Sequence, residues 1–357
     1  MDGLSESLGH SPELYPHELD VGKDTVTFIR LGRADYDAAS FLDARLLTPR
    51  TVGHTLSWRQ VAAAIETAKL TERCNFIFHI GHVGSTLLSR LVGAHPAAFA
   101  LREPILLRIF AQLQRESGTS PTAWSDAEFE TRLGGCLKLL SRTFDPQQRA
   151  VIKATSIVSE LADCLLSRTS APKALLMYVA PESYLATILG GPNSRREAKM
   201  LAPSRLQRLH QRVGSEAWRL QSLSEGEILA LSWACETSAL VQAAHTADRR
   251  ALGLDFDQFL DRPAEVLLAA LRHLELEAAA DEVASILQGP TMRRYSKAPE
   301  YAYDAALRLE VLNEARATHG AEIRRGLAWL DRAAAQFAPV RDAMAFAVTA
   351  GMHGSAT

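Results

Sequence analysis

The sequence has 357 residues, of which 47% are hydrophobic and 22% charged, and its 39 Lys and Arg nearly balance its 41 Asp and Glu for a net charge of −2. This composition excludes a collagen-like chain, wholesale disorder and a disulfide scaffold. The near-neutral charge argues against a protein that coats nucleic acid, because such proteins need net basic charge to release counterions from phosphates. The length suits one large α/β domain with insertions, or two typical domains.

The N-terminal segment MDGLSESLGHSPELYPHELD (1–20) is polar and acidic, which is not typical of a signal peptide. We expect residues 1–22 to be a weakly ordered lead-in and residues 341–357 to be a C-terminal tail. Four scattered cysteines without a C-x-x-C pair favour reduced thiols. No apolar run approaches the roughly 20 residues that span a bilayer. These features predict a cytoplasmic protein without a membrane span.

Short apolar runs alternate with helical patterns along the chain. Strand character is found in residues 24–31, 75–80, 149–154, 173–180 and 250–260. Helical spacing of apolar residues is found in residues 58–70, 87–95, 122–143, 159–168, 204–247 and 263–287. This alternation predicts an α/β fold, in which helices cover both faces of a parallel β-sheet. We expect a single domain over residues 23–340, with helical insertions near 122–143 and 193–247.

The sharpest local signal is a glycine-containing turn between a strand and a helix. The apolar run NFIFHI (75–80) is followed by GHVGST (81–86) and then by a helical pattern. The first N–H groups of such a helix have no intrahelical partner and suit a phosphate or sulfate. Gly81 and Gly84 permit the backbone conformations that such a nest needs. The lysine of the nucleoside-triphosphatase loop is absent, so the loop does not indicate ATP hydrolysis. A tight turn capped by Ser and Thr would leave the same pattern.

From this loop onward the sequence resembles the sulfotransferase family, whose phosphosulfate-binding loop reads roughly P-(K/R)-S-G-(S/T)-T-x-L. Five segments match family motifs in consistent order: FIFHIGHVGSTLLSRLVGAHP (76–96), ALREPILLRIF (100–110), VIKATS (151–156), APKALLMYVAPESYLATIL (171–189) and LGLDFDQFLDRPAEVLLAALRHLEL (252–276). The resemblance implies a P-loop-like fold and the donor 3′-phosphoadenosine-5′-phosphosulfate. The implied partner is a hydroxyl or amine acceptor on a small molecule, lipid or glycan. The cysteines and histidines show no metal-ligand spacing, so we expect no metal, and the near-neutral charge predicts no nucleic-acid partner.

The resemblance also implies roles for individual residues. The loop residues that it assigns to donor binding are Gly81, His82, Val83, Gly84, Ser85, Thr86 and Leu87. In the matching branches of the family the glutamate of the Arg-Glu-Pro segment is the general base, and this position is Glu103. Lys153, at the end of the next strand, would stand near the bridging oxygen of the donor. The same residues have simpler explanations: Glu103 could pair with Arg102 or Arg108 on the surface, and Lys153 could snorkel to solvent. The imidazole of His82 is an alternative base.

The sequence departs from the family pattern at two positions that usually carry a cation. His82 replaces the lysine or arginine of the loop, and its charge near pH 7 depends on its surroundings. His79, three residues earlier, could assist His82 or simply end the strand. The arginine that contacts the 3′-phosphate falls at Val179, while the partner serine becomes Thr187 and keeps its hydroxyl. A guanidinium is the usual ligand for a phosphate, so another cation must replace it.

Two basic clusters could supply that cation. The first lies in residues 193–212 and contains Arg195, Arg196, Lys199, Arg205, Arg208 and Arg212. The second contains Arg293, Arg294 and Lys297, beside tyrosines 295, 301 and 303 that could stack on a purine. We take Arg196 and the second cluster as candidate donor ligands. The alternative for both is a solvated, charged surface.

Three functional hypotheses follow from these residues. Glu103, Lys153 and the ordered motifs favour a sulfotransferase. The replaced cations at His82 and Val179 favour a protein of the same fold that binds another nucleotide, such as a kinase, or a catalytically silent nucleotide-binding protein. The sequence leaves the acceptor open, and the chain could form a homodimer.

Overall fold

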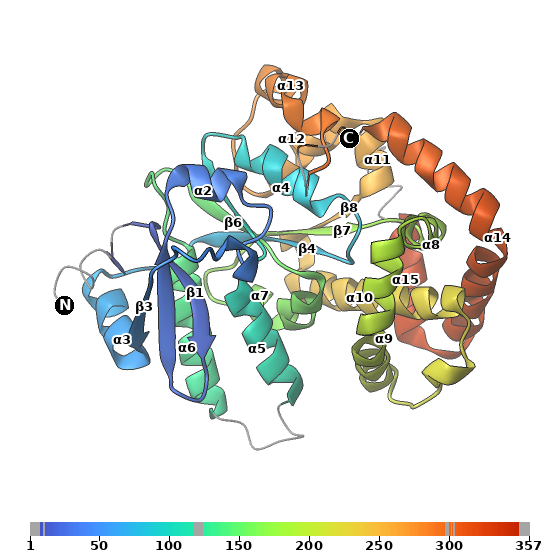
Figure 1. Ribbon diagram of the computed structural model, residues 1–357, viewed down its shortest axis with the longest axis horizontal. Coiled ribbons are helices and arrows are strands. Elements are labelled where there is room, and N and C mark those ends of the chain that lie inside the picture. The colour runs from blue at the N-terminus through green and yellow to red at the C-terminus, as the bar shows by residue number, and fades with distance from the viewer. Residues whose placement is uncertain are drawn as a thin grey trace.

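A five-stranded parallel sheet forms the centre of the molecule, in the order β5-β6-β4-β7-β8 (Figure 1). The computed structural model describes residues 8–9, 11–116, 124–296, 300, 302 and 304–349. The strands of this sheet are β4 (Cys74–His79), β5 (Ala98–Arg102), β6 (Arg149–Lys153), β7 (Ala174–Tyr178) and β8 (Ala251–Asp255). All four strand pairings are parallel, so the predicted α/β fold is confirmed.

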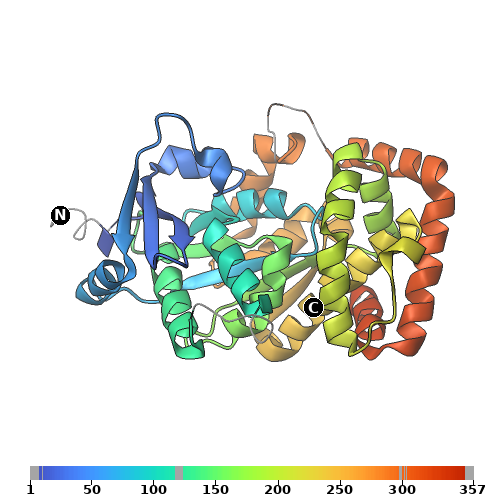
Figure 2. The same ribbon diagram turned by 60° about the horizontal axis from the view of Figure 1, so that its bottom comes forward.

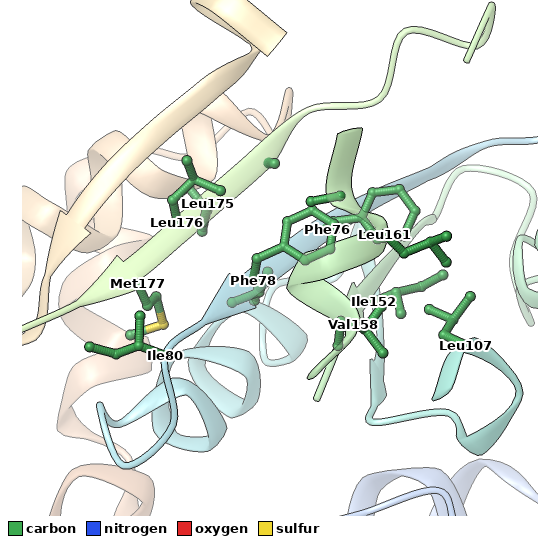
Figure 3. Packing of buried hydrophobic residues seen from close by; sticks show 14 of the residues in the cluster. Phe76, Phe78, Ile80, Leu107, Ile152, Val158, Leu161, Leu175, Leu176 and Met177 are labelled. Carbon is green, nitrogen blue, oxygen red and sulfur yellow. The ribbon is translucent and has the colours of Figure 1, made fainter. Parts of the chain in front are cut away.

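The central strands are continuous apolar runs because both faces of the sheet are covered. Every residue of β4 is buried, and so is every residue of β7. On one face the rings of Phe76 and Phe78 stack with centroids 5.3 Å apart. They lie against Val158 and Leu161 of a 3₁₀ segment, η2 (Ser156–Leu161), as Figure 3 shows. This packing fixes the position of β4 and of the loop that follows it.

Helices flank the sheet on both sides. α4 (Ser85–Gly93) and α12 (Pro263–His273) lie on one side, whereas α7 (Ala162–Leu166) and α10 (Glu225–Ala247) lie on the other (Figure 1). The remaining helices along this body are α5 (Ile105–Glu116), α6 (Asp126–Leu140), α8 (Pro181–Leu189), α9 (Pro192–Val213), α11 (Phe256–Asp261) and α13 (Ala280–Gln288). The long helical stretch expected over 204–247 is therefore divided between α9 and α10. α9 ends at Gly214, which has φ +68°.

The N-terminal part of the chain forms a second, antiparallel sheet that the sequence patterns did not predict in full. Its strands are β1 (Leu14–Asp20), β2 (Thr25–Arg30) and β3 (Gly53–Ser57), followed by α2 (Arg33–Ala38) after β2 and α3 (Trp58–Thr67) after β3. The expectation of a weakly ordered lead-in over 1–22 is corrected for β1. This strand pairs with β2 along its length and buries Leu14, Tyr15 and Leu19. In the sequence, acidic residues stand beside these apolar side chains, so the segment lacks a clear strand pattern.

The C-terminal helices α14 (Ala305–Gln336) and α15 (Ala338–Thr349) gather with α9 at the opposite end from the antiparallel sheet (Figure 2). α15 continues into the segment expected to be a tail, which corrects that boundary. It is held by the buried side chains of Val340 and Ala343, and Phe346 packs on Tyr178 of β7 with ring centroids 5.0 Å apart. Among the residues described, no helix has the length and apolar content needed to cross a bilayer.

Candidate functional site

Three of the predicted polar residues meet where adjacent strands end. In a parallel sheet the carboxyl ends of all strands lie at one edge, where α/β proteins bind ligands. His79 ends β4, Lys153 ends β6, and Glu103 directly follows β5. Because the order of these strands is β5-β6-β4, Lys153 lies between the other two. The structure therefore brings Glu103 and Lys153 together beside the loop that follows β4.

The loop between β4 and α4 has an unusual backbone. Gly81, His82 and Gly84 have φ values of +85°, +56° and +65°. Gly84 is required here for a second reason, because a Cβ at this position would lie 2.0 Å from the ring of Phe256. The N–H groups of the first turn of α4 follow directly, and the dipole of the helix favours an anion there. The loop thus has the left-handed turns and close packing of an anion nest.

The hydroxyl groups at the start of α4 are buried. Ser85 is 5% exposed and Thr86 is 2% exposed. Within the part of the chain that the structure describes, Thr86 Oγ1 has no hydrogen-bond partner. A buried hydroxyl without a partner is costly, so this oxygen is available to a bound oxyanion. The other two predicted loop residues, Val83 and Leu87, pack in the hydrophobic core.

Glu103 and Lys153 form a buried ion pair. Lys153 Nζ contacts Glu103 Oε1, and the two side chains are 0% and 11% exposed. The backbone N–H of Glu103 also donates to Lys153 O at 2.6 Å, and Glu103 has a φ of +56°. This left-handed turn at the end of β5 directs the carboxylate toward β6. The surface pairs with Arg102 or Arg108 are thus not the partners that the structure gives Glu103.

Arg102 has a structural role instead. Its guanidinium donates to the carbonyl oxygens of Tyr36 and Ala39 at the C-terminal end of α2. Burial lowers the pKa of Arg102 to about 10, and the neighbouring charge of Arg90 adds to this effect. A cation at the C-terminus of a helix satisfies its free carbonyl groups. Arg102 therefore attaches α2 to the end of β5.

His79 lies on the other side of the ion pair. Its Nδ1 accepts a hydrogen bond from the N–H of Gly81 at 3.0 Å, which assigns the proton of the neutral ring to Nε2. This Nε2 is 4.0 Å from Glu103 Oε1. His79, which ends β4, consequently joins the start of the loop to the buried carboxylate.

His82 faces α9 rather than the ion pair. Its Nε2 is 3.3 Å from Glu197 Oε2, and its Nδ1 is 3.4 Å from Ser194 Oγ. The ring is partly buried, with 19% of the side chain exposed. These contacts place the His82 ring against the start of α9.

Two side chains from the N-terminal part of the chain also reach this site, and sequence reasoning missed both. The Arg45 guanidinium lies over the ring of Phe41 at 3.4 Å, and the same ring is 5.6 Å from Lys153 Nζ. Hydrogen bonds to Asp43 raise the pKa of Arg45, and the negative charges of Glu103 and Glu197 raise it further. Residues 41–45 have no periodic pattern, so only their position in space reveals the connection.

The remaining predicted donor ligands lie on α8, on α9 and around a 3₁₀ segment that follows α13. Thr187 Oγ1 donates to Ser183 O inside α8, and Arg196 is exposed on α9. Arg293 and Arg294 are exposed around a 3₁₀ segment, η5 (Pro290–Arg293), which packs against α4. Lys297, Tyr301 and Tyr303 lie outside the described residues. Val179 is buried in the core, where its carbonyl accepts a hydrogen bond from Trp233.

The basic residues of α9 are mostly engaged in ion pairs. Arg195 and Lys199 contact Glu225 at 2.6 and 3.0 Å. Deeper along the helix, the acidic partners are Glu236 and Glu160, and the pairs are Arg205–Glu236, Arg208–Glu236, Arg208–Glu160 and Arg212–Glu160. These arginines attach α9 to α10 and η2. Most of this cluster is therefore neither a solvated face nor a set of open phosphate ligands.

The described residues contain no group of three or more His, Cys, Asp or Glu side chains that could hold a metal ion. The site consists instead of an anion nest, a buried carboxylate–lysine pair and two histidines at one edge of the sheet. Such an arrangement can bind an anion at the loop and exchange a proton beside it.

Comparisons with solved structures find similar chains at low identity. The sulfotransferase domain from the curacin biosynthetic pathway is 15% identical, with 70% of this chain and 98% of that chain covered and a TM-score of 0.39. Sulfotransferase STF9 from Mycobacterium avium is 13% identical, with 73% and 82% covered and a TM-score of 0.39. Retinol dehydratase in complex with androsterone and inactive cofactor PAP is 11% identical, with 78% and 88% covered and a TM-score of 0.32. No protein-family model and no curated protein matches the sequence.

Proposed function

We propose that this protein transfers a sulfuryl group from 3′-phosphoadenosine-5′-phosphosulfate to a hydroxyl or amine acceptor. The observation that carries the proposal is the buried Glu103–Lys153 pair, which lies at the ends of β5 and β6 next to the loop after β4. Sulfuryl transfer needs an anion site, a cation at the leaving oxygen and a base at the acceptor. One edge of the sheet offers all three.

The loop and the first turn of α4 fit the phosphosulfate group of the donor. Left-handed turns at Gly81, His82 and Gly84 give the loop the form of an anion nest. Thr86 Oγ1 is buried and has no partner among the described residues, so it can donate to a donor oxygen. His82, which contacts Glu197, stands at the position where the resembled family has a lysine or arginine and can donate a hydrogen bond to a donor oxygen.

Glu103 and Lys153 would divide the chemistry between them. As the acceptor oxygen forms a bond to sulfur, Glu103 accepts its proton. The bond between sulfur and the bridging oxygen breaks, and its electron pair stays on that oxygen of the leaving adenosine 3′,5′-bisphosphate. Lys153 stabilises the charge that develops there. Because Lys153 Nζ contacts Glu103 Oε1 in the structure, the lysine must shift toward the leaving oxygen, which frees the carboxylate to act as a base.

Ligand-dependent thermal unfolding tests the donor. A ligand that binds only the folded state stabilises it by about 2.7 kcal/mol at a hundred times its Kd. We expect adenosine 3′,5′-bisphosphate to raise the melting temperature more than ATP with magnesium does. A clear shift with ATP and none with millimolar bisphosphate would contradict the proposal and favour a kinase-like protein.

Transfer itself is tested with the phosphosulfate donor and a panel of phenols, alcohols and amines. We expect release of adenosine 3′,5′-bisphosphate to increase with at least one acceptor and a sulfated product to be seen by mass spectrometry. Binding of the bisphosphate without transfer to any acceptor would favour a catalytically silent binding protein.

A further inference from the structure

One buried arginine next to the loop is not explained by the site described above. Arg308, in the first turn of α14, has a side chain that is only 6% exposed. Its guanidinium carbon is 5.1 Å from the centroid of the Phe256 ring. The same ring fills the space that a Cβ on Gly84 would need. One aromatic ring therefore separates this cation from the anion nest, although more than 200 residues lie between them in the sequence.

The guanidinium of Arg308 is only partly used by the protein. Its Nη2 contacts Asp257 Oδ1 at 2.5 Å. Its Nε is buried and, within the described residues, has no hydrogen-bond partner. An unsatisfied buried donor costs about 1–3 kcal/mol, so a bound acceptor at this Nε–H would recover that free energy.

Arg316 on the same helix provides a direct contrast. It also attaches α14 to the carboxyl edge of the sheet, through Glu182 at the start of α8. Its Nε and Nη2 donate to the two carboxylate oxygens of Glu182 at 2.7 and 2.8 Å, and its Nη1 donates to Asn313 at 3.0 Å. Arg316 thus uses all three nitrogens for anchoring, whereas Arg308 keeps an open Nε beside the loop. Within the described residues Arg208 of α9 also has an open Nε, but it lies among the ion pairs with Glu236 and Glu160.

We propose that Arg308 binds the phosphate on C3′ of the donor nucleotide. The inference rests on the proposed function, which supplies a ligand with anionic groups on both its 5′ and 3′ carbons. The nest takes the first, and Arg308 beyond the Phe256 ring takes the second through its free Nε–H. This assignment supplies the guanidinium that is missing at Val179, where the side chain is uncharged and buried. With Arg308 in this role, the arginines of α9 are not needed as ligands of the 3′-phosphate. Most of them are paired with Glu225, Glu236 and Glu160.

The test compares two nucleotides that differ only in the 3′-phosphate. Calorimetry gives the Kd of adenosine 3′,5′-bisphosphate and of adenosine 5′-phosphate for the wild type, Arg308→Gln, Arg308→Lys and the control Arg316→Gln. A hydrogen bond between charged groups is worth about 1.5–3 kcal/mol, or roughly 10- to 100-fold in affinity. We expect Arg308→Gln to weaken bisphosphate binding by this factor and to leave binding of the 5′-phosphate nearly unchanged.

The two control substitutions distinguish recognition of the 3′-phosphate from a general loss of order in α14. Arg316→Gln removes a comparable anchor and should leave the preference for the bisphosphate intact. Arg308→Lys keeps the charge and should retain part of that preference, which also covers the case in which Arg308→Gln does not fold. An equal loss of both ligands in the Arg308 variants, or no loss, would overturn the inference.

Failure of the proposed function is distinguishable from failure of this inference. A wild-type protein that binds neither nucleotide would contradict both. A wild-type protein that prefers the bisphosphate, with Arg308 variants that keep the same preference, would contradict the role of Arg308 alone.

Discussion

Two buried carboxylates, Glu236 and Glu103, are each paired with a cation but are held in different ways. Glu236 lies in the middle of α10, and its Oε1 accepts hydrogen bonds from Arg205 Nε and Arg208 Nη2, both at 2.8 Å. Arg208 Nη1 donates to its second oxygen at 3.3 Å. Glu103 follows a strand in a left-handed conformation and is paired with Lys153, a compact cation on a flexible stem.

This difference separates an ion pair that maintains the fold from one that can change partners. Two arginines from one helix surround Glu236, so moving either cation would leave a buried charge. Lys153 ends the strand between β5 and β4, and in the proposed mechanism an incoming anion competes with the Glu103 carboxylate for its ammonium group. We therefore expect removal of Glu236 to affect stability. Removal of Glu103 should affect activity and also lower stability, because it leaves the buried Lys153 without its counter-ion.

The largest effect is expected for Glu236→Gln. Because this substitution leaves Arg205 buried without its counter-ion and Arg208 with Glu160 alone, it should lower the free energy of unfolding by about 3–5 kcal/mol. Urea denaturation measures the change. The control is Glu182→Gln, whose partner Arg316 is about as exposed as Glu182 itself, at 35% and 37%. That pair should be worth at most about 1 kcal/mol. Equal losses in the two variants would contradict the distinction.

The same pair predicts a pH dependence. Burial alone would raise the pKa of Glu236, but the charges of Arg208 and Arg205 lower it from 4.5 to about 2. A carboxyl group whose pKa is lower in the folded state contributes stability above its unfolded pKa and loses it as the pH falls through the folded value. Wild-type stability should therefore decline between about pH 4.5 and pH 2 more steeply than that of Glu236→Gln.

The next effect is expected for Glu103→Gln. If Glu103 is the base, turnover should fall by about 100-fold or more, while binding of adenosine 3′,5′-bisphosphate survives. Steady-state kinetics and calorimetry measure the two quantities. Glu72→Gln is a matched control, because Glu72 pairs with Arg168, is 13% exposed and precedes β4 at the opposite edge of the sheet. Unchanged turnover in Glu103→Gln, or an equal loss in Glu72→Gln, would remove Glu103 from the mechanism.

A smaller effect on stability is expected for a third carboxylate, Asp255, which accepts hydrogen bonds from backbone N–H groups. It accepts from Asp257 N and Gln258 N at the start of α11, and burial raises its pKa from 3.8 to about 6. A raised pKa means that stability present at low pH is lost as the pH rises between these values. Asp255→Asn keeps the cap and removes the charge. It should be more stable than the wild type at pH 8, by at most about 3 kcal/mol for a shift of about two pKa units.

Thermal unfolding of Asp255→Asn and the wild type at pH 8 and at low pH measures this difference. Below the unfolded pKa of 3.8 both side chains are neutral, so the two proteins should then be nearly equally stable. A variant that is less stable than the wild type at pH 8 would show that the charge of Asp255 is compensated in the folded state.

Local patterns determined the central layers of this protein. The apolar runs that became β4, β6 and β7 and the glycine turn before α4 are visible in the sequence, because strand burial and backbone turns depend on neighbouring residues. The order of these motifs along the chain predicted the parallel sheet. The same local reasoning missed β1, in which buried and charged side chains are mixed, and joined two helices across the break at Gly214.

Partners of charged side chains were decided only by the tertiary structure. Glu103 pairs with Lys153, 50 positions away, rather than with the adjacent Arg102, because neighbouring strands end side by side. The basic run in α9 meets carboxylates of α10 and η2, which no local charge pattern reveals. Arg308 lies beside the loop because α14 returns to the carboxyl edge of the sheet. A charge acts over a few ångströms in space, and distance along the chain does not predict which charges come that close.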